Sequence, residues 1–249
     1  MFKNLDDYTL QARVSPILIV CFPTLLWIAS LFSGESTFLG LLTSLISFCG
    51  LGPLIGQLGR DSGLKRQEEL LKQWGGKPTT LLFRFTNSKL DRHMLEEIHS
   101  NMKFLLPDTP NITNADERQD QSKTDSIYER WTNYLREATR DYHLVQQENI
   151  NYGFRRNLFG LRVIGIGMAI LPLLVIMLES LSAKPSEPLF STAMTKVTVG
   201  ISFFALWFHW QIVSANWVKT AADAYAKRLL FSSDRLVAAK KTQATVVRD

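Results

Sequence analysis

His93, Glu96 and His99 are the residues of this 249-residue chain whose types could hold a metal ion. They follow one another at intervals of three on a stretch of helical composition. A zinc-binding helix places two histidines four residues apart, so that both project from one face. Intervals of three drift around a helix instead, and we interpret this segment as a solvated helix face. Neither this segment nor the rest of the sequence brings together convergent acids, histidines and a nucleophile. The sequence therefore predicts no enzyme, no metal site and no cofactor.

His209 is the one ionisable residue deep inside a long apolar stretch, at residues 196–217. An ionisable side chain at membrane depth is costly to bury and commonly marks a functional position. His209 could face a pore, or it could sense protons because histidine titrates near neutral pH. The alternative is a neutral histidine that forms a hydrogen bond with a neighbouring helix. Both interpretations stay open at this stage.

Basic residues cluster where two apolar stretches end and begin. Folding would bring the two groups near one plane, where they could bind anionic lipid headgroups or line a pocket for a phosphorylated signal molecule. They could equally serve only to set the topology of the chain in the membrane. The candidates for a lipid or ligand site are Arg60, Lys65, Arg66, Arg155 and Arg156.

Four apolar stretches must position these residues, and each is long enough to cross a bilayer, which takes about 20 helical residues. They run over residues 14–32, 37–58, 159–180 and 196–217. Short connections join the first to the second and the third to the fourth. The predicted fold is a mainly α membrane protein, with four transmembrane helices arranged as two hairpins that flank a mostly helical cytoplasmic insert. Cys21 and Cys49 both lie in apolar stretches and need no role beyond packing.

Small residues give two of these stretches faces on which helix backbones can approach closely. Gly52 and Gly56 form a GxxxG pair in the second stretch, and the first half of the third stretch also contains glycines. The faces could pack within one subunit, or they could form a seam between subunits or along a pore. The candidates are Gly50, Gly52, Gly56, Gly165 and Gly167, together with His209.

The polar insert at residues 59–158 reads as mostly helical. Residues 60–74 have helical composition, whereas residues 79–85 (TTLLFRF) are β-branched and aromatic and predict a short strand. Ser88 and Asp91 resemble a capping box that opens a helix through about Lys103. We expect a polar loop over residues 107–125. Apolar residues at helical spacing then predict one long helix over residues 124–148.

Lysine and arginine are distributed very unevenly about the four stretches. The insert carries 16 of the 28, whereas the two short connections contain only Lys184 and Lys196. By the positive-inside rule, the insert and both termini are cytoplasmic. The expected organisation is a cytoplasmic N-terminus (1–13), a first transmembrane hairpin (14–58), a cytoplasmic domain (59–158), a second hairpin (159–217) and a cytoplasmic C-terminal helix and tail (218–249).

Three short stretches of the sequence, taken together with this architecture, indicate a resemblance to a known family. They are Arg60-Asp61, residues 74–80 (WGGKPTT) and residues 152–161 (YGFRRNLFGL). With the arrangement of two spans, a cytoplasmic insert and two further spans, the chain resembles the bacterial four-transmembrane effectors of anti-phage defence systems. The resemblance implies location in the bacterial inner membrane, activation by a cytoplasmic protein partner or a nucleotide second messenger, self-association and disruption of the membrane. It assigns a role to no individual residue.

The expected function is therefore an inner-membrane effector that oligomerises and forms or gates a pore, regulated through its cytoplasmic domain. Membrane lipids and further copies of the chain are the expected partners. Nucleic acid is not, because acids nearly balance bases in the insert. The alternative is a non-conducting membrane anchor or scaffold for a cytoplasmic partner. The scarcity of polar residues in the spans favours a pore that is closed at rest.

Overall fold

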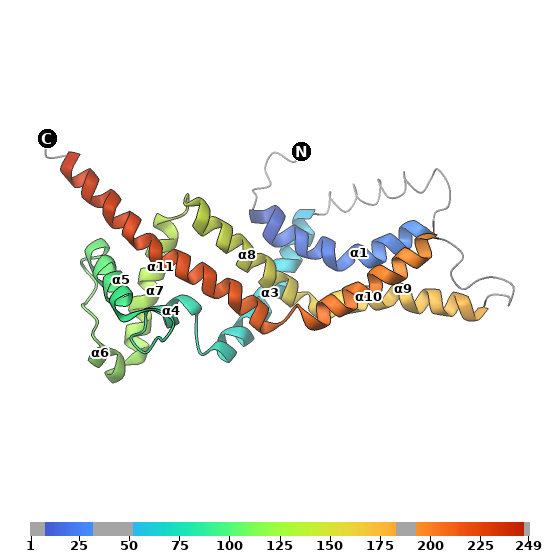
Figure 1. Cartoon of the computed structure of the whole chain (residues 1–249), viewed down its shortest axis with the longest axis horizontal. Helices are drawn as coiled ribbons and strands as arrows, with labels where there is room; N and C mark the ends of the chain where they lie inside the picture. The colour runs from blue at the N-terminus through green and yellow to red at the C-terminus, as the bar shows by residue number, and fades with distance from the viewer. Residues whose placement is uncertain (1–7, 32–51, 183–192, 247–249) are drawn as a thin grey trace. The chain divides into compact units, whose positions relative to one another are not determined.

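The computed structural model describes residues 8–31, 52–182 and 193–246, and over these ranges the chain is mostly helical and contains no strand (Figure 1). It divides into two compact units. Unit 1 comprises residues 1–68 and 150–218, and unit 2 comprises residues 69–149 and 219–249. Three long helices, α3 (Gly52–Trp74), α8 (His143–Gly160) and α11 (Ala215–Val246), belong partly to each unit.

Unit 1 is built around three apolar helices that pack on one another: α1 (Ser15–Ser30), α9 (Arg162–Ser182) and α10 (Ala193–Gln211) (Figure 1). A π-helical turn, η1 (Thr9–Val14), leads into α1. Two segments, Thr9–Ala29 and Arg162–Leu181, are long and apolar enough to cross a membrane, and a third qualifies if α10 and α11 are counted as one bent span. The predicted second span lies largely outside the described residues, so the count of four spans stays a prediction.

Contrary to the prediction, the fourth apolar stretch is not one continuous helix, because the helix breaks before Trp217. α10 ends at Gln211 and α11 begins at Ala215, and the two helices are bent by 66°. The N–H groups of Ile212 and Val213 both donate to the carbonyl of Phe208, which ends the helical pattern. Ser214 then accepts a hydrogen bond from the N–H of Trp217 through its hydroxyl, as an N-cap does. The tail therefore starts a new helix in a new direction.

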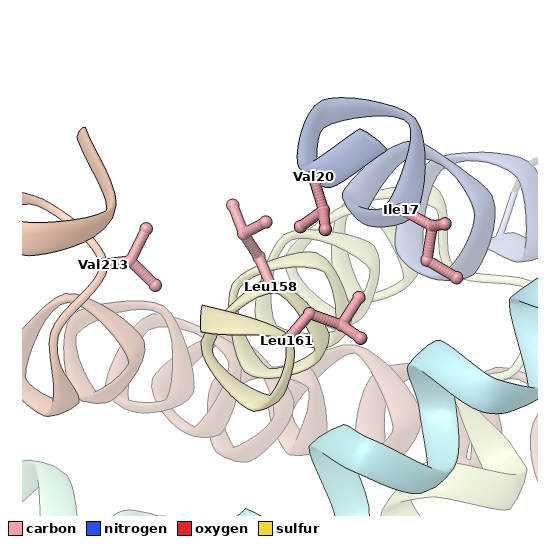
Figure 2. Close-up of a cluster of buried hydrophobic side chains, with 5 residues drawn as sticks. All are labelled: Ile17, Val20, Leu158, Leu161 and Val213. Atoms are coloured by element: carbon pink, nitrogen blue, oxygen red, sulfur yellow. The ribbon is translucent and has the colours of Figure 1, made fainter. Parts of the chain in front are cut away.

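The third predicted span begins slightly later than expected. α8 ends at Gly160, Leu161 lies in a turn, and α9 starts at Arg162. Backbone hydrogen bonds from Leu161 to Asn157 and from Gly165 to Leu161 continue across this turn. Figure 2 shows Leu158 and Leu161 projecting toward Ile17 and Val20 of α1. These four residues and Val213, in the connection after α10, form the buried cluster that holds this part of unit 1 together.

Unit 2 has an aromatic core, and the predicted strand at residues 79–85 is wrong. Residues Pro78–Phe83 form helix α4 instead. Proline at the first helical position favours a helix start, and four of the six residues of α4 are buried. A short apolar run that is buried almost all round cannot be assigned to strand or helix by periodicity. Phe83 at the end of α4 stacks on Tyr128, with ring centroids 5.5 Å apart, and contacts the edge of Trp131.

The remaining boundaries in unit 2 also differ from prediction. α5 (Arg92–Leu105) is preceded by Asp91, whose side chain makes no capping bond, so the capping box expected at Ser88 is not formed. The polar loop contains α6 (Asn114–Gln119), which is opened by a capping box between Thr113 and Asp116. The predicted long helix is two helices, α7 (Gln121–Ala138) and α8, separated by a turn at residues 139–142. The helical spacing of apolar residues continues across this turn, because residues on both sides of it are buried. The sequence pattern therefore did not reveal the break between the two helices.

Candidate functional site: the buried polar face of α10

Helix α10 carries a stripe of polar residues on one face. Thr198, Ser202 and His209 are 0%, 0% and 1% exposed. At about 100° per residue, the positions 198, 202 and 209 fall within roughly 40° of one another around the helix axis. The structure therefore brings His209, which the sequence singled out, together with two hydroxyl side chains that sequence reasoning missed. Their shared helical phase was the signal that could have found them.

These three side chains have polar atoms with no hydrogen-bond partner in the part of the chain that the structure describes. The atoms are Thr198 Oγ1, Ser202 Oγ and His209 Nδ1. Buried polar atoms are nearly always paired in native proteins, and a lipid surrounding offers no water to replace a missing partner. Unit 1 does pair other hydroxyls: Thr24 Oγ1 on α1 donates to the carbonyl of Met168 at 2.6 Å. Among the described residues of unit 1, three of the four unpaired buried side-chain polar atoms thus lie on this face of α10, the other being Arg13 Nε.

Gly165 of α9 packs directly against His209. A Cβ built at Gly165 would lie 2.6 Å from Cε1 of the imidazole, so no larger residue fits while the histidine stays in place. Gly167, two residues later, is exposed, and no atom of the residues that the structure describes lies within 4 Å of its Cβ position. The two candidates therefore differ. Gly165 leaves room for the His209 ring inside unit 1, whereas Gly167 lies on the exposed side of α9. Gly50 lies outside the described residues, and Gly52 and Gly56 fall at the start of α3.

An apolar groove of about 250 Å³ runs between α1 and α10, with His209 in its wall. Phe22 and Pro23 contribute from α1, and Phe204 and Phe208 contribute from α10. Phe22 and Phe204 are half or more exposed. The apolar groove therefore borders the polar face of α10, and His209 belongs to both.

Arg155 is held by contacts within unit 1. Its Nη1 donates to the carbonyl of Trp217 at 3.0 Å, its Nε donates to Asn151 Oδ1 at 3.1 Å, and its guanidinium lies 4.9 Å from the centroid of the Trp217 ring. Trp217 is in the first turn of α11, directly after the 66° bend. Arg155 therefore fixes the start of α11 to α8, and this engagement is a structural role for one of the predicted lipid or ligand candidates.

Arg156 belongs to a second polar junction of unit 1. Its Nη1 donates to Gln67 Oε1 at 2.9 Å, and its Nε and Nη2 each donate to Asn157 Oδ1 at 3.2 Å. Asn157 is fully buried, and its Nδ2 donates to the carbonyl of Ala12 at 2.7 Å. Asn157 thus links α8 to η1, which the sequence did not indicate. The other three basic candidates, Arg60, Lys65 and Arg66, are exposed on α3.

The three residues weighed as metal ligands do not converge. His93 is exposed, Glu96 pairs with Arg92 at 3.0 Å, and His99 is enclosed by the aromatic core of unit 2. His99 Nε2 lies 2.8 Å from the carbonyl of Phe83, so this nitrogen carries the proton, and Nδ1 is buried without a partner. Across residues 8–31, 52–182 and 193–246, no group of three or more potential ligands could hold a metal ion.

The stability of unit 2 is expected to fall in mild acid because of His99. Burial lowers the pKa of this imidazole, and it outweighs the carbonyl of Phe83 and the carboxylate of Glu117, which act in the opposite direction. The unfolded chain therefore takes up the proton first, near pH 6.5. Stability should be constant above that pH and should decline below it, by up to about 1.4 kcal/mol per pH unit, until the folded pKa is passed.

Thermal unfolding followed from pH 8 to pH 5 tests this expectation. His99→Phe should flatten the decline, whereas the exposed control His93→Gln should leave it unchanged. An equal decline in the wild type and in His99→Phe would show that another group is responsible.

Comparison with models of protein families, with curated proteins and with solved structures finds no match to this chain.

Proposed function

We propose that this chain is a bacterial inner-membrane effector that self-associates and forms or gates a membrane pore, acting in anti-phage defence and regulated through its cytoplasmic part. The resemblance of residues 60–61, 74–80 and 152–161 to four-transmembrane defence effectors supports the biological setting. Two apolar segments support location in a membrane, because Thr9–Ala29 (η1 with α1) and Arg162–Leu181 of α9 are both long enough to cross one. The regulatory part corresponds to unit 2.

The observation that carries the pore proposal is the unpaired polar face of α10. Each buried polar group without a partner costs about 1–3 kcal/mol, so this face disfavours the closed bundle that contains it. A rearrangement that turned Thr198, Ser202 and His209 toward water would satisfy all three. The closed bundle is then a resting state held together by the remaining contacts of unit 1, and the polar face of α10 lines the path that opens.

Self-association requires a surface that the described residues leave uncovered, and α9 offers one. Its outward face carries large apolar side chains that are 37–69% exposed, and Gly167 lies among them with no neighbour within 4 Å in the described part of the chain. A small residue allows a second helix to approach its backbone closely in lipid. The exposed members of this face are Val163, Ile164, Gly167, Ile170, Leu171, Leu174, Met177 and Leu178.

The double variant Thr198→Val, Ser202→Ala separates the pore role from a structural one. Both changes remove unpaired polar atoms and nearly keep the side-chain shape, so the melting temperature in detergent should stay equal or rise. Permeabilisation should be lost, because the path would have no hydroxyl groups to hold water. The measurement is membrane potential in bacteria induced to express each chain, read with a potential-sensitive dye. At high expression the wild type should lower the potential, because the unpaired face of α10 destabilises the closed state and lets it open part of the time without a trigger. The double variant should preserve the potential.

Thr24→Val is the matched control, because this threonine is also buried (7% exposed) but its hydroxyl is bonded to the carbonyl of Met168. It should lose about 1 kcal/mol of stability and keep its effect on the membrane potential. If the double variant collapsed the potential as fully as the wild type, the polar face of α10 would have no part in permeabilisation.

A non-conducting anchor for a cytoplasmic partner is the second candidate. It is favoured by unit 2, whose own aromatic core around Phe83, Tyr128 and Trp131 gives it the character of an independent docking domain. This candidate predicts an intact potential at high wild-type expression, with the chain's effects depending on the surface of unit 2 and unaffected by changes on α10.

A further inference from the structure

A cavity of about 300 Å³ in unit 2 lies between α11 and the turn that joins α7 to α8. Residues 141–145 form one wall, and Arg228, Phe231, Ser232 and Arg235 form the other. Its size is at the lower end of the range for small-molecule sites. This cavity could not be predicted from the sequence, because its two walls are more than 80 residues apart along the chain.

Positive charge predominates in this cavity. Arg228 and Arg235 are seven residues apart on α11, so they project from the same face two turns apart. His143 stands on the opposite wall, and Asp141 is the acidic residue among the lining side chains. Among the residues that the structure describes, neither arginine has a hydrogen bond or an ion pair, unlike Arg84 of the same unit, which binds Asp125 through both Nε and Nη2. The two guanidinium groups are therefore free to bind an anion.

The other lining groups suit an organic anion better than a bare ion. Tyr142 and Phe231 offer aromatic surfaces on the two walls. The hydroxyl of Ser232 donates to the carbonyl of Leu229 and is not bonded to either arginine. The first turn of α8 also borders the cavity, and amide N–H groups at a helix start reinforce anion binding where cationic side chains already provide it. Arginine is well suited to phosphate because its planar fork can donate two parallel hydrogen bonds.

We propose that this cavity binds the phosphate group of a small organic phosphate through Arg228 and Arg235, with the organic part packed on Tyr142 and Phe231. The same chemistry is available from a soluble phosphate ester and from a phospholipid headgroup, so the site takes its ligand from one of these two sources. This inference rests on unit 2 alone and holds whether or not the chain permeabilises membranes.

Isothermal titration of the full chain in uncharged detergent with AMP tests the proposal. AMP should bind, adenosine should not, and inorganic phosphate should bind more weakly than AMP. Arg228→Gln and Arg235→Gln should each weaken AMP binding at least about tenfold, the loss expected for a charge-assisted contact. Both side chains are exposed, so the melting temperature should be unchanged. Arg136→Gln, an exposed arginine of α7 outside the cavity, should bind AMP normally.

A second arm identifies the source of the phosphate. The same chains are titrated with mixed micelles containing phosphatidylglycerol. Binding of these micelles, with the same dependence on Arg228 and Arg235 but without AMP binding, would assign the site to a lipid headgroup and support the phosphate chemistry. The proposal is overturned if neither probe binds, or if the two arginine variants bind as the wild type does.

Discussion

Gly160→Ala should destabilise unit 1 by more than about 2 kcal/mol, although most glycine-to-alanine changes in a helix are stabilising. A Cβ at this position would lie 2.5 Å from the carbonyl carbon of Ser62 and 2.6 Å from the backbone nitrogen of Gly63. Both are backbone atoms of α3, so no side-chain rotation can relieve the overlap, and α8 and α3 must separate. Forcing extra atoms into a packed site typically costs 1–3 kcal/mol. Thermal unfolding of the purified chain in detergent measures the loss.

Gly200→Ala is the control for this prediction. The position is helical and exposed in α10 and, among the residues that the structure describes, has no neighbour within 4 Å of the added carbon, so the substitution should be neutral or should stabilise by about 0.5–1 kcal/mol through the gain in helix propensity. The two variants thus differ in sign. Equal melting temperatures for Gly160→Ala and Gly200→Ala would show that α3 and α8 do not cross at Gly160.

Glu117→Ala should have the largest effect on unit 2, about 2–4 kcal/mol. The carboxylate is 3% exposed, and its Oε2 accepts from the N–H of Phe85 at 2.9 Å and from the hydroxyl of Tyr128 at 3.0 Å. Burial, and next the Glu117 charge itself, raise the pKa of Tyr128, so its hydroxyl remains a donor. Removing the carboxylate leaves both donors buried without an acceptor, and each then carries its full desolvation cost.

Glu129→Ala provides the comparison, because Glu129 pairs with Lys77 at a site where both side chains are about half exposed. Exposed ion pairs contribute between 0 and about 1 kcal/mol, so this change should hardly alter the unfolding transition. The measurement is thermal unfolding followed by near-ultraviolet circular dichroism, which reports the aromatic core around Trp131. If the two glutamate variants unfolded at the same temperature, Glu117 would not be the acceptor that the core requires.

Hydrophobic length and helical composition predicted the mainly α fold and the apolar segments, because these depend on long stretches of sequence. Helix ends were harder to predict. The break at residues 212–214 depends on Ser214, whose type permits capping but also occurs inside helices. The short helix α4 was mistaken for a strand because β-branched and aromatic residues fit either structure once they are buried on all sides. In both places the decisive factor is tertiary packing.

The candidate site was predicted in part. His209 stood out from the sequence because an ionisable residue in an apolar stretch is rare, and Gly165 was recognised as a close-packing position. Thr198 and Ser202 were missed, because a hydroxyl residue in a span usually bonds to a carbonyl of its own helix, and only the folded unit shows that these two do not. The roles of Arg155 and Asn157 were hidden for a similar reason: their partners, Trp217 and Ala12, are more than 60 and 140 residues away.

Ion flux through liposomes that contain the purified chain tests the central claim most directly, since no other cellular protein is present. Liposomes loaded with a self-quenching dye or held at a potassium potential should leak slowly with the wild type, because the unpaired face of α10 lets the closed state open part of the time without an activator. They should retain at least about nine-tenths of their contents or potential with the double variant Thr198→Val, Ser202→Ala, although that variant is equally stable and equally well inserted. Leakage at the same rate from both would contradict the claim that the polar face of α10 lines a conducting path.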